Sequence, residues 1–378
     1  MSMQIHTSAP GRICLFGEHQ DYLDLPVIAM GIDLRFHIQG TLHARPEFEI
    51  HTPDIDDGAV QTLPLDLKQP RSRDDFVWGI LRVLQDEGFT FPRTATLNFH
   101  SEIPFRAGCS SSSAMTAAWM RLLLEIGEHA DKVGYIDDPD RVAHLVYKGE
   151  KELFQGAGGM MDQYSCYLGG LVYVFPRDSH GVRTANAAAY GVERLANVPE
   201  DLILIDSGQP KDTQGVLATV GDRARGAVQL LREKIPQFDL KRTLLSDFDA
   251  QVRAIPLTTL ESESCAVVRD HIINRDLCRE GLDMLRGSID PQRLGAMLNE
   301  EHRILSETLG ISTPAIDSIL TDCLEAGALG GKINGSGGGG TCFCYAPGRV
   351  DAVSEMLTAK KVRHFRIHKD SGARLEMN

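Results

Sequence analysis

The sequence predicts two domains that each combine strands and helices, an α+β architecture. The chain has 378 residues, a length that is typical of two domains. Short apolar strand patterns dominate the N-terminal part, whereas long amphipathic helix patterns fill most of the C-terminal half. The pattern changes between residues 175 and 200, and we therefore expect domains at residues 1–185 and 186–378.

The composition is that of an ordinary globular protein, with 42% hydrophobic and 24% charged residues. The formal net charge of -13 argues against a nucleic-acid partner, because phosphate-binding surfaces are basic. No apolar run approaches the length of a membrane span, and the first residues lack the pattern of a secretion signal. We expect a cytoplasmic protein without a membrane partner, either a monomer or a homodimer.

The eight cysteines are expected to be reduced thiols. No two of them have the spacing C-x-x-C. Cys342 and Cys344 alternate along a predicted strand, which is a poor arrangement for a zinc site.

The elements follow from hydrophobic periodicity and from turn residues. In the N-terminal half we expect strands at 3–10, 26–33, 94–100 and 169–175, a hairpin over 37–50, a loop over 54–75, and helices from 76 and over 137–154. Gly40 is placed at the turn of the hairpin, because glycine is common in tight turns. In the C-terminal half we expect strands at 202–206, 341–345 and 364–368, and helices over 214–234, 241–253, 263–286, 291–307, 314–326 and 350–359.

Residues 104–115, PFRAGCSSSSAM, join a bend at Gly108 to a strongly helical run that begins near Ala114. Serine is a favoured helix N-cap, and small residues let a ligand approach the backbone. The free N–H groups of a first helical turn, together with the helix dipole, favour a phosphate group. By itself the stretch is either a phosphate-binding loop or a serine-rich surface loop.

Other stretches of the sequence favour the phosphate-binding interpretation of the serine loop. An apolar strand that contains Arg12 runs directly into residues 17–22, GEHQDY, and strand ends hold polar groups rigidly in many binding sites. A glycine run at 156–159 interrupts a helix, and Asp162 then opens a short new one. Residues 330–340, GGKINGSGGGG, lie between apolar segments, where bare backbone permits close approach to a ligand or to another loop. The motif GxxxxGK[ST] is absent, which excludes an ordinary P-loop.

Three separated motifs occur in the order GR…GEHxDY, PxxxGxSSSSA and a glycine-rich loop before a late strand. Their order and spacing resemble those of the GHMP small-molecule kinases over nearly the whole chain. Within that superfamily the sequence looks most like galactokinase, because residues 17–22 resemble its GEHTDY signature and residues 159–163, GMMDQ, resemble its GIMDQ. Residues 26–33 are similar to mevalonate kinase, and residues 331–340 are similar to heptose kinases.

The resemblance implies the GHMP kinase fold, with the active site in the cleft between the domains and with ATP and Mg²⁺ as cofactors. It implies phosphorylation of a sugar hydroxyl, with the anomeric position of galactose or a related aldose expected. Asp162 would take or orient the proton of the attacking hydroxyl, and Arg12 would stabilise this carboxylate and the transferred phosphoryl group. The expected sugar-binding residues are Glu18, His19, Asp21 and Gly159.

The resemblance also implies that the nucleotide contacts the serine loop and the glycine-rich loop. A hydroxyl of Ser111 or, as we expect, of Ser112 would hold Mg²⁺ together with the carboxylate of Glu150, since Mg²⁺ prefers oxygen ligands. Trp78 resembles an aromatic residue near the adenine pocket, although a core position on an amphipathic helix explains it equally well. The expected ATP-binding residues are Trp78, Gly108, Ser110, Ser111, Ser112, Ser113, Gly337 and Gly338.

Alternatives remain open for the substrate. Galactokinases usually supply a sugar-contacting tyrosine from the loop near 207–215, but no tyrosine lies between Tyr190 and Tyr345. A GHMP kinase for another alcohol, such as mevalonate or a heptose, is therefore one alternative. A non-catalytic sensor of sugar and ATP is another, against which the retention of Arg12, Glu150 and Asp162 argues.

Overall fold

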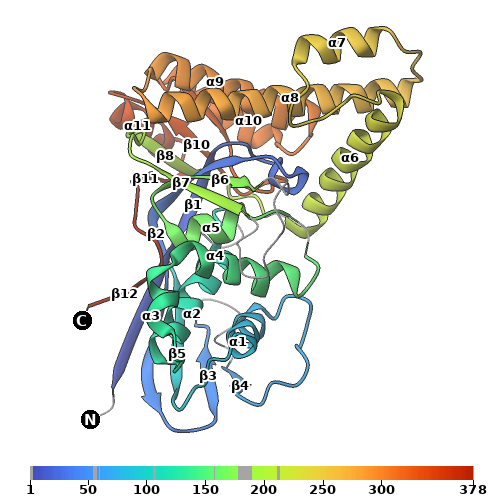
Figure 1. Cartoon of the computed structure of the whole chain (residues 1–378). Helices are drawn as coiled ribbons and strands as arrows, with labels where there is room; N and C mark the ends of the chain where they lie inside the picture. Colours follow the sequence, from blue (N-terminus) through green and yellow to red (C-terminus); the bar gives the residue numbers. More distant parts are fainter. Residues whose placement is uncertain are drawn as a thin grey trace.

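The computed structural model describes residues 3–53, 58, 60–104, 108–156, 158–177, 190–210 and 213–377. It contains two sheets, each with helices packed on it, as Figure 1 shows. The first sheet extends through the lower part of the figure, and the long helices of the C-terminal half lie in the upper part. The mixed architecture predicted from the sequence is confirmed.

The first sheet has eight strands within the described residues, in the order β12-β1-β2-β5-β3-β4, with β6 paired to β2 and β7 paired to β6. Its longest pairing is the antiparallel one between β1 and β2, in which Gln4 lies opposite Thr41 and Phe16 opposite Ile28. The strands are β1 (Gln4–Phe16), β2 (Val27–His43), β3 (Glu47–His51), β4 (Val60–Pro64), β5 (Thr94–Ser101), β6 (Leu171–Pro176), β7 (Tyr190–Leu195) and β12 (Arg374–Leu375).

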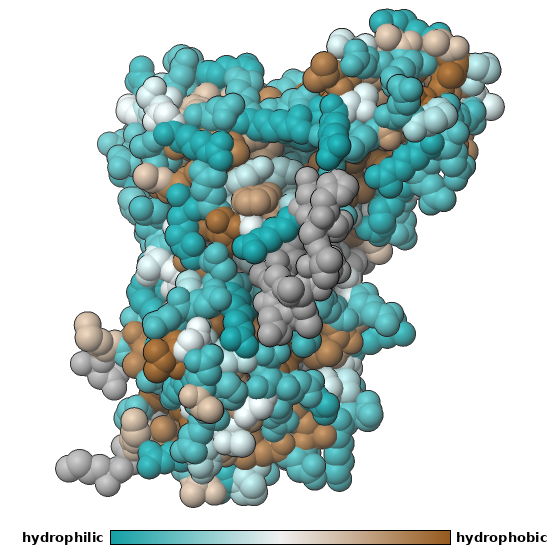
Figure 2. All heavy atoms as spheres, in the orientation of Figure 1, coloured by the Kyte–Doolittle hydropathy of each residue, from teal (hydrophilic) through white to brown (hydrophobic). Residues whose placement is uncertain are grey.

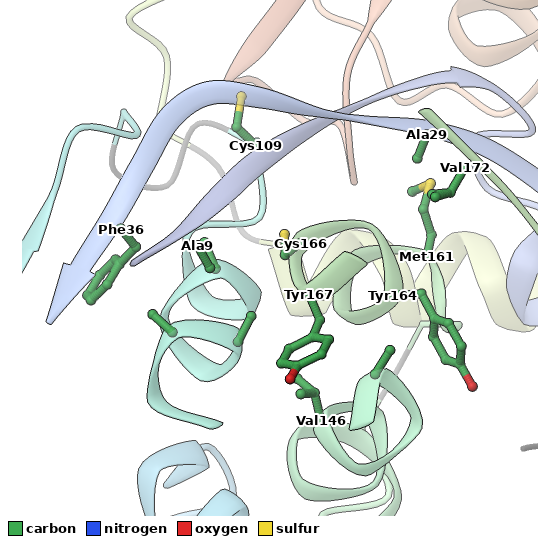
Figure 3. Packing of buried hydrophobic residues seen from close by; sticks show 14 of the residues in the cluster. Ala9, Ala29, Phe36, Cys109, Val146, Met161, Tyr164, Cys166, Tyr167 and Val172 are labelled. Atoms are coloured by element: carbon green, nitrogen blue, oxygen red, sulfur yellow. The ribbon is translucent and has the colours of Figure 1, made fainter. Parts of the chain in front are cut away.

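Helices cover this sheet and bury its apolar face. Small residues let α2 approach β1 closely, so that Thr7 donates a hydrogen bond to the carbonyl oxygen of Ala118 at 3.0 Å. Figure 3 shows Tyr167 of α5 directed toward Val146 of α4 in the same interior. The elements are η1 (Asp21–Leu23), α1 (Phe76–Asp86), α2 (Ser111–Ile126), α3 (Lys132–Asp137), α4 (Pro139–Tyr147), the π-helical turn η3 (Lys148–Glu152) and α5 (Met161–Leu168).

The second sheet is antiparallel throughout, in the order β11-β8-β10-β9. The longest helix that follows β8, α8, begins with a capping box in which the side chains of Thr258 and Glu261 each accept from the other residue's backbone N–H group. The elements are β8 (Leu202–Asp206), α6 (Thr213–Lys234), α7 (Leu245–Arg253), α8 (Thr259–Arg286), α9 (Pro291–Arg303), the π-helical turn η4 (Ile304–Thr308), α10 (Pro314–Glu325), β9 (Gly330–Ile333), β10 (Thr341–Tyr345), α11 (Val350–Ala359) and β11 (Arg363–Ile367).

Two strands that follow residue 186 belong to the first sheet. β7 pairs with β6, and β12 returns to β1, where Leu375 lies opposite Thr7. The sheets therefore do not divide the chain at the predicted boundary between residues 185 and 186. The C-terminal segment crosses back because β1 would otherwise present an unpaired edge.

Other local predictions differ from the structure. Gly40 is not at a turn but inside β2, where a Cβ would come 2.1 Å from the carbonyl oxygen of Thr96 in β5. The predicted hairpin is absent from the described residues, because β5 lies between β2 and β3. Part of the predicted loop over 54–75 forms β4, and the helix predicted over 137–154 is α4 followed by the π turn η3.

The glycine-rich loop lies directly against the serine loop. A Cβ on Gly335 would come 2.4 Å from the carbonyl oxygen of Gly108, and the φ of Gly335 is 79°, in the left-handed region that favours glycine. A Cβ on Gly339 would meet the carbonyl oxygen of Pro210 at 2.9 Å. At Gly335 and Gly339 the bare backbone thus permits contact between loops, which is one of the two uses that the sequence allowed.

This contact predicts unequal effects of two alanine substitutions. Gly335→Ala and Gly348→Ala both force alanine into left-handed backbone, at about 1–2 kcal/mol each. Only Gly335→Ala also meets a neighbouring carbonyl group, since nothing lies within 4 Å of a Cβ on Gly348. We expect Gly335→Ala to lower the thermal unfolding midpoint clearly more than Gly348→Ala in scanning calorimetry. Equal losses would show that the two loops do not press on each other.

Candidate active site

A cavity of about 510 Å³ lies where the three sequence motifs meet. Its wall comes from β1 and the segment after it, from the serine loop and α2, from the π turn and the glycine run before α5, and from the glycine-rich loop. The predicted site residues that line it are Arg12, Glu18, His19, Asp21, Gly108, Ser110, Ser111, Ser112, Glu150, Gly159 and Asp162.

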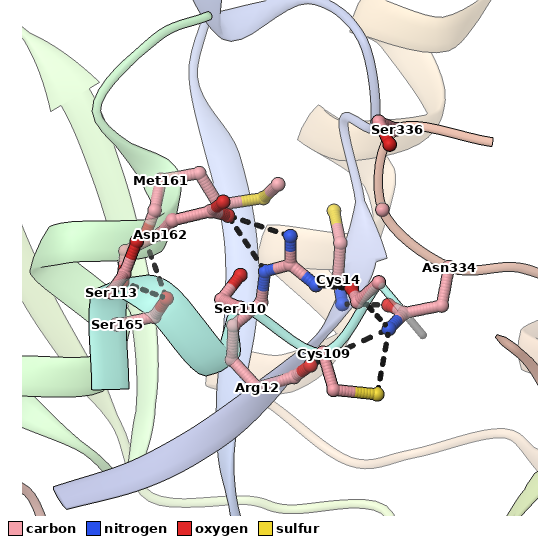
Figure 4. Close-up of polar contacts among 12 residues, drawn as sticks. Arg12, Cys14, Cys109, Ser110, Ser113, Met161, Asp162, Ser165, Asn334 and Ser336 are labelled. Atoms are coloured by element: carbon pink, nitrogen blue, oxygen red, sulfur yellow. Dashed lines mark hydrogen bonds and ion pairs between the residues drawn. The ribbon is translucent and has the colours of Figure 1, made fainter. Parts of the chain in front are cut away.

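Arg12 and Asp162 form an ion pair in this wall, as Figure 4 shows. Nε and Nη2 of Arg12 donate to Oδ1 of Asp162 at 2.8 and 2.6 Å, and Nη1 donates to the carbonyl oxygen of Gly108 at 2.5 Å. The Arg12 side chain is 3% exposed, whereas the Asp162 side chain is 31% exposed. Arg12 thus fixes a carboxylate that remains open to the cavity, as the sequence predicts.

The surroundings keep Asp162 ionised. Burial acts to raise its pKa, but the charges of Arg12 and Lys151 and hydrogen bonds from Arg12 and Ser110 outweigh burial, so the pKa lies below its usual value of 3.8. A carboxylate with a low pKa orients a hydroxyl well but is a weak base. It suits a reaction in which the proton leaves late.

The serine loop opens α2 at the edge of the cavity. Ser110 has a φ of 59°, in the left-handed region, and its side chain does not cap the helix. The N–H groups of the first helical turn have no intrahelical acceptor, so this end of α2 suits an anion. Ser111 and Ser112 line the cavity, whereas Ser113 is fully buried and donates to Oε1 of Glu150 at 2.9 Å. Ser113 was also predicted to bind ATP, but its buried side chain does not line the cavity.

Glu150 is buried on the π turn η3, at 2% exposure. Its two carboxylate oxygens accept hydrogen bonds from Ser113 and Thr116, at 2.9 Å each. The turn packs tightly on α1, where a Cβ on Gly79 would come 2.2 Å from the carbonyl oxygen of Gly149. Burial raises the pKa of Glu150 above its usual value of 4.5. π turns of this kind are frequent at functional sites.

The oxygen atoms around Glu150 fit a magnesium ion. The carboxylate oxygens of Glu150 accept from Ser113 and Thr116, a carboxylate offers about four lone-pair sites in all, and the hydroxyls of Ser111 and Ser112 line the same cavity. A buried carboxylate with a raised pKa is stabilised by a nearby cation. Nowhere in the described ranges do three His, Cys, Asp or Glu side chains form a metal-binding group. Few protein ligands are typical of Mg²⁺ sites that also use substrate phosphates.

Glu18 and His19 follow β1 and are held by the glycine-rich loop. Oε2 of Glu18 accepts from Nζ of Lys332 at 3.2 Å and from the N–H of Gly335 at 2.9 Å. Nε2 of His19 lies 3.1 Å from the carbonyl oxygen of Ser336. The φ of His19 is 59°, which is unusual for a residue other than glycine, and such strained positions are concentrated at binding sites.

Asp21 joins the substrate motif to the segment before Asp162. Its Oδ2 accepts from the N–H of Met161 at 3.2 Å, and a Cβ on Gly159 would come 2.2 Å from its carboxyl carbon. Only glycine at position 159 permits this approach. Burial and the neighbouring charge of Asp162 raise the pKa of Asp21 to about 6.

Two of the predicted nucleotide ligands lie elsewhere. Among the residues that the structure describes, Gly337 and Gly338 do not line the cavity, and the N–H of Gly338 donates to the carbonyl oxygen of Ile311 at 2.7 Å. Gly335 and Ser336 line it instead. The sequence does not distinguish glycines that line a cavity from glycines that contact another loop, because both positions need a backbone without side chains.

Trp78 lies behind the cavity wall rather than in it. Its ring packs on Phe154 at 6.3 Å, and Phe154 also packs on Phe76 at 5.9 Å. Two neighbouring aromatic residues line the cavity in its place: Phe76 of α1, and Phe154, which follows the π turn η3. The sequence analysis also missed Lys151, whose one signal was its place next to Glu150. Other lining residues that it missed are Arg73, Asp74, Gln155 and Leu217.

The face seen in Figure 2 is mostly hydrophilic, in keeping with the charged composition. Over the part of the chain that the structure describes, no helix is both long enough and apolar enough to span a membrane. The eight cysteines are all buried, and each is a thiol rather than part of a disulfide.

Comparison with protein families now adds to this geometry. The family "GHMP kinases N terminal domain" matches residues 75–170, "GHMP kinases C terminal" matches residues 278–363, and the "Galactokinase galactose-binding signature" matches residues 2–41. Together with the site, these matches define an ATP-dependent small-molecule kinase. The chain belongs to the GHMP kinases.

Relatives with different substrates are similar to this chain. Mevalonate kinase of Thermococcus sibiricus is 26% identical over 95% of this chain and 93% of its own length, and galactokinase of Haemophilus influenzae is 25% identical over 94% and 88%. The solved structure of Lactococcus lactis galactokinase complexed with galactose has a TM-score of 0.78 at 18% identity, over 98% of this chain and 95% of that chain. Methanococcus jannaschii mevalonate kinase has a TM-score of 0.65 at 19% identity, over 98% and 99%. These solved structures support the two-domain GHMP fold.

Glu150→Gln tests the metal site. The substitution keeps the size of the side chain and removes its charge, so the Mg²⁺ concentration that gives half-maximal activity should rise about tenfold to a hundredfold. The measurement is a Mg²⁺ titration at fixed ATP in a coupled ADP-release assay. Glu152→Gln, an exposed position on the same turn, is the matched control and should leave the titration unchanged. An unaltered Mg²⁺ requirement in Glu150→Gln would remove Glu150 from the metal site.

Proposed function

We propose that this protein transfers the γ-phosphoryl group of ATP to a sugar hydroxyl, and that the acceptor is the anomeric hydroxyl of galactose or a related aldose. The observation that carries the proposal is the Arg12–Asp162 ion pair in one cavity with Glu18, His19 and Asp21. The match of the galactose-binding signature to residues 2–41 supports a sugar acceptor.

Asp162 accepts the hydrogen bond of the acceptor hydroxyl and then its proton. Phosphoryl transfer passes through a loose transition state, so the attacking oxygen carries little positive charge until late. A carboxylate of low pKa is sufficient, because orientation contributes more than basicity. Arg12 neutralises Asp162 and contributes positive charge where the phosphoryl group moves.

The other side of the cavity suits the nucleotide. The first turn of α2 and the hydroxyls of Ser110, Ser111 and Ser112 bind the phosphate chain, and Lys151 adds a cation to the same cavity. Ser112 and Glu150 hold Mg²⁺, which neutralises phosphate charge when bound. The residues of the chain therefore separate the two substrates, with Asp162 between them.

Sugar recognition rests on the rigid polar groups after β1. Glu18, His19 and Asp21 present fixed hydrogen-bonding groups, and such a site discriminates against analogues that lack a matching hydroxyl. Tyr22 also lines the cavity, and its hydroxyl lies 3.3 Å from Nδ1 of His19. It offers an aromatic hydroxyl to a site whose loop near 207–215 has no tyrosine.

A panel of acceptors tests the proposal. ADP release is measured with ATP and galactose, other aldohexoses, a heptose and mevalonate, and the position of the phosphate is assigned by ³¹P NMR. We expect the highest kcat/KM with galactose or a close epimer, and a 1-phosphate product. Turnover restricted to mevalonate would contradict the sugar proposal, and absence of turnover with every acceptor would favour a sensor.

Asp162→Asn tests the assigned base. The variant keeps the shape of the side chain and loses its charge, so kcat should fall about a hundredfold to ten-thousandfold. Arg12→Ala should cost a similar factor, and the double variant should cost less than the product of the two, because the pair acts as a unit.

Nucleotide binding supplies the control for these variants. The dissociation constant of ATP, measured by calorimetry, should stay close to wild type in Asp162→Asn. Asp137→Asn, an exposed position at the end of α3, should leave both kcat and ATP binding unchanged. Near-wild-type kcat in Asp162→Asn would show that Asp162 is not the base.

A further inference from the structure

Three ionisable side chains are buried together next to the cavity. Glu18 is 1% exposed, and Glu301 of α9 and Lys332 of β9 are fully buried. Nζ of Lys332 lies 3.2 Å from Oε2 of Glu18 and 3.9 Å from Oε1 of Glu301, and it donates to the carbonyl oxygen of Cys14 at 2.9 Å. Buried charges are costly unless they are paired, so one ammonium group between two carboxylates needs an explanation.

Glu301 holds the backbone of the substrate motif. Its Oε1 accepts from the N–H groups of Gly17 and Glu18, at 3.0 and 2.9 Å. Asn274 of α8 donates to the carbonyl oxygen of Glu18 at 3.0 Å. Both peptide groups of Glu18 are therefore fixed by helices of the C-terminal half.

The carboxylate of Glu18 is fixed as well. Oε2 accepts from Lys332 and from the N–H of Gly335, at 3.2 and 2.9 Å. Glu18 nevertheless lines the cavity, whereas Glu301 and Lys332 do not, among the residues that the structure describes. Lys332 of β9 and the N–H of Gly335 thus hold one carboxylate oxygen of Glu18, while Glu18 remains part of the cavity wall.

We propose that Lys332 and Glu301 are positioning residues that hold Glu18 as an oriented hydrogen-bond acceptor for one hydroxyl of the phosphoryl acceptor. Lys332 supplies the positive charge that pairs with the carboxylate of Glu18, and Glu301 fixes the N–H groups of Gly17 and Glu18. The two residues therefore determine acceptor specificity without touching the acceptor. This inference rests on the proposed function, because it requires that Glu18 contact the acceptor.

A double-mutant cycle between Glu18 and Lys332 tests this proposal. The assay uses ATP with galactose, or with the acceptor that gives the highest kcat/KM in the panel. Glu18→Gln and Lys332→Met should each raise the acceptor KM about tenfold to a hundredfold, with the KM for ATP changed less than about twofold. The double variant should be no worse than Glu18→Gln alone, because Lys332 acts through Glu18.

The outcomes separate the two claims. An unchanged acceptor KM in Glu18→Gln would overturn the assignment of Glu18 to the acceptor. A raised KM in Glu18→Gln but not in Lys332→Met, or additive effects in the double variant, would overturn the positioning role alone. Lys360→Met removes an exposed lysine that pairs with Asp322 on the surface, and as the control it should change neither KM.

Glu301→Gln carries the test if Lys332→Met does not fold. Gln keeps an oxygen for the two N–H donors and removes one charge beside Lys332. Burial raises the pKa of Glu301 to about 7, and the groups that face it are Lys332, Glu18 and the thiols of Cys14 and Cys278. The wild-type acceptor KM should therefore contain a pH-dependent change centred near pH 7 that Glu301→Gln lacks, whereas the change due to Asp21 near pH 6 should remain in both proteins. Identical pH profiles for the two proteins would overturn the proposal.

Discussion

The carbonyl oxygen of Gly108 is the point on which the site depends. It accepts hydrogen bonds from Nη1 of Arg12, at 2.5 Å, and from Nδ2 of Asn334, at 3.1 Å. Oδ1 of Asn334 in turn accepts from the N–H of Cys14 at 3.0 Å, and Figure 4 shows this junction. Arg12 and Asn334 are buried and must find partners, so the first strand, the serine loop and the glycine-rich loop can satisfy their polar groups only by meeting there.

The three motifs could be predicted from the sequence, because their signals are local. Glycine and serine before a run of helix formers specify a loop and a helix start wherever they occur, and α2 begins at Ser111. The pairing of Arg12 with Asp162, whose atoms lie 2.6 Å apart, was instead implied by the family resemblance, because the two residues are far apart in the sequence. The family resemblance supplied the roles, which residue patterns alone leave open.

The misplaced residues share one physical cause, which is dependence on distant neighbours. Gly40 is a glycine because β5 passes against β2, and nothing near Gly40 in the sequence encodes that strand. Phe76 and Trp78 lie on one helix and both pack on Phe154, far along the chain, but of these two only Phe76 lines the cavity. The cluster of Glu18, Glu301 and Lys332 was invisible for the same reason, since its members come from three separate elements.

Two carboxylates of the site have pKa values that are displaced in opposite directions. Burial and the charge of Asp162 raise the pKa of Asp21 to about 6, whereas Arg12 and Lys151 overcome burial and lower that of Asp162. Neighbouring groups with separated pKa values are suited to different tasks. Near neutral pH Asp162 therefore stays ionised, as the proposed role of proton acceptor needs, whereas Asp21 titrates about one pH unit below neutrality. The ion pair with Arg12 is therefore what separates the pKa of Asp162 from that of its neighbour, and it keeps an ionised carboxylate where the proposed reaction releases its proton.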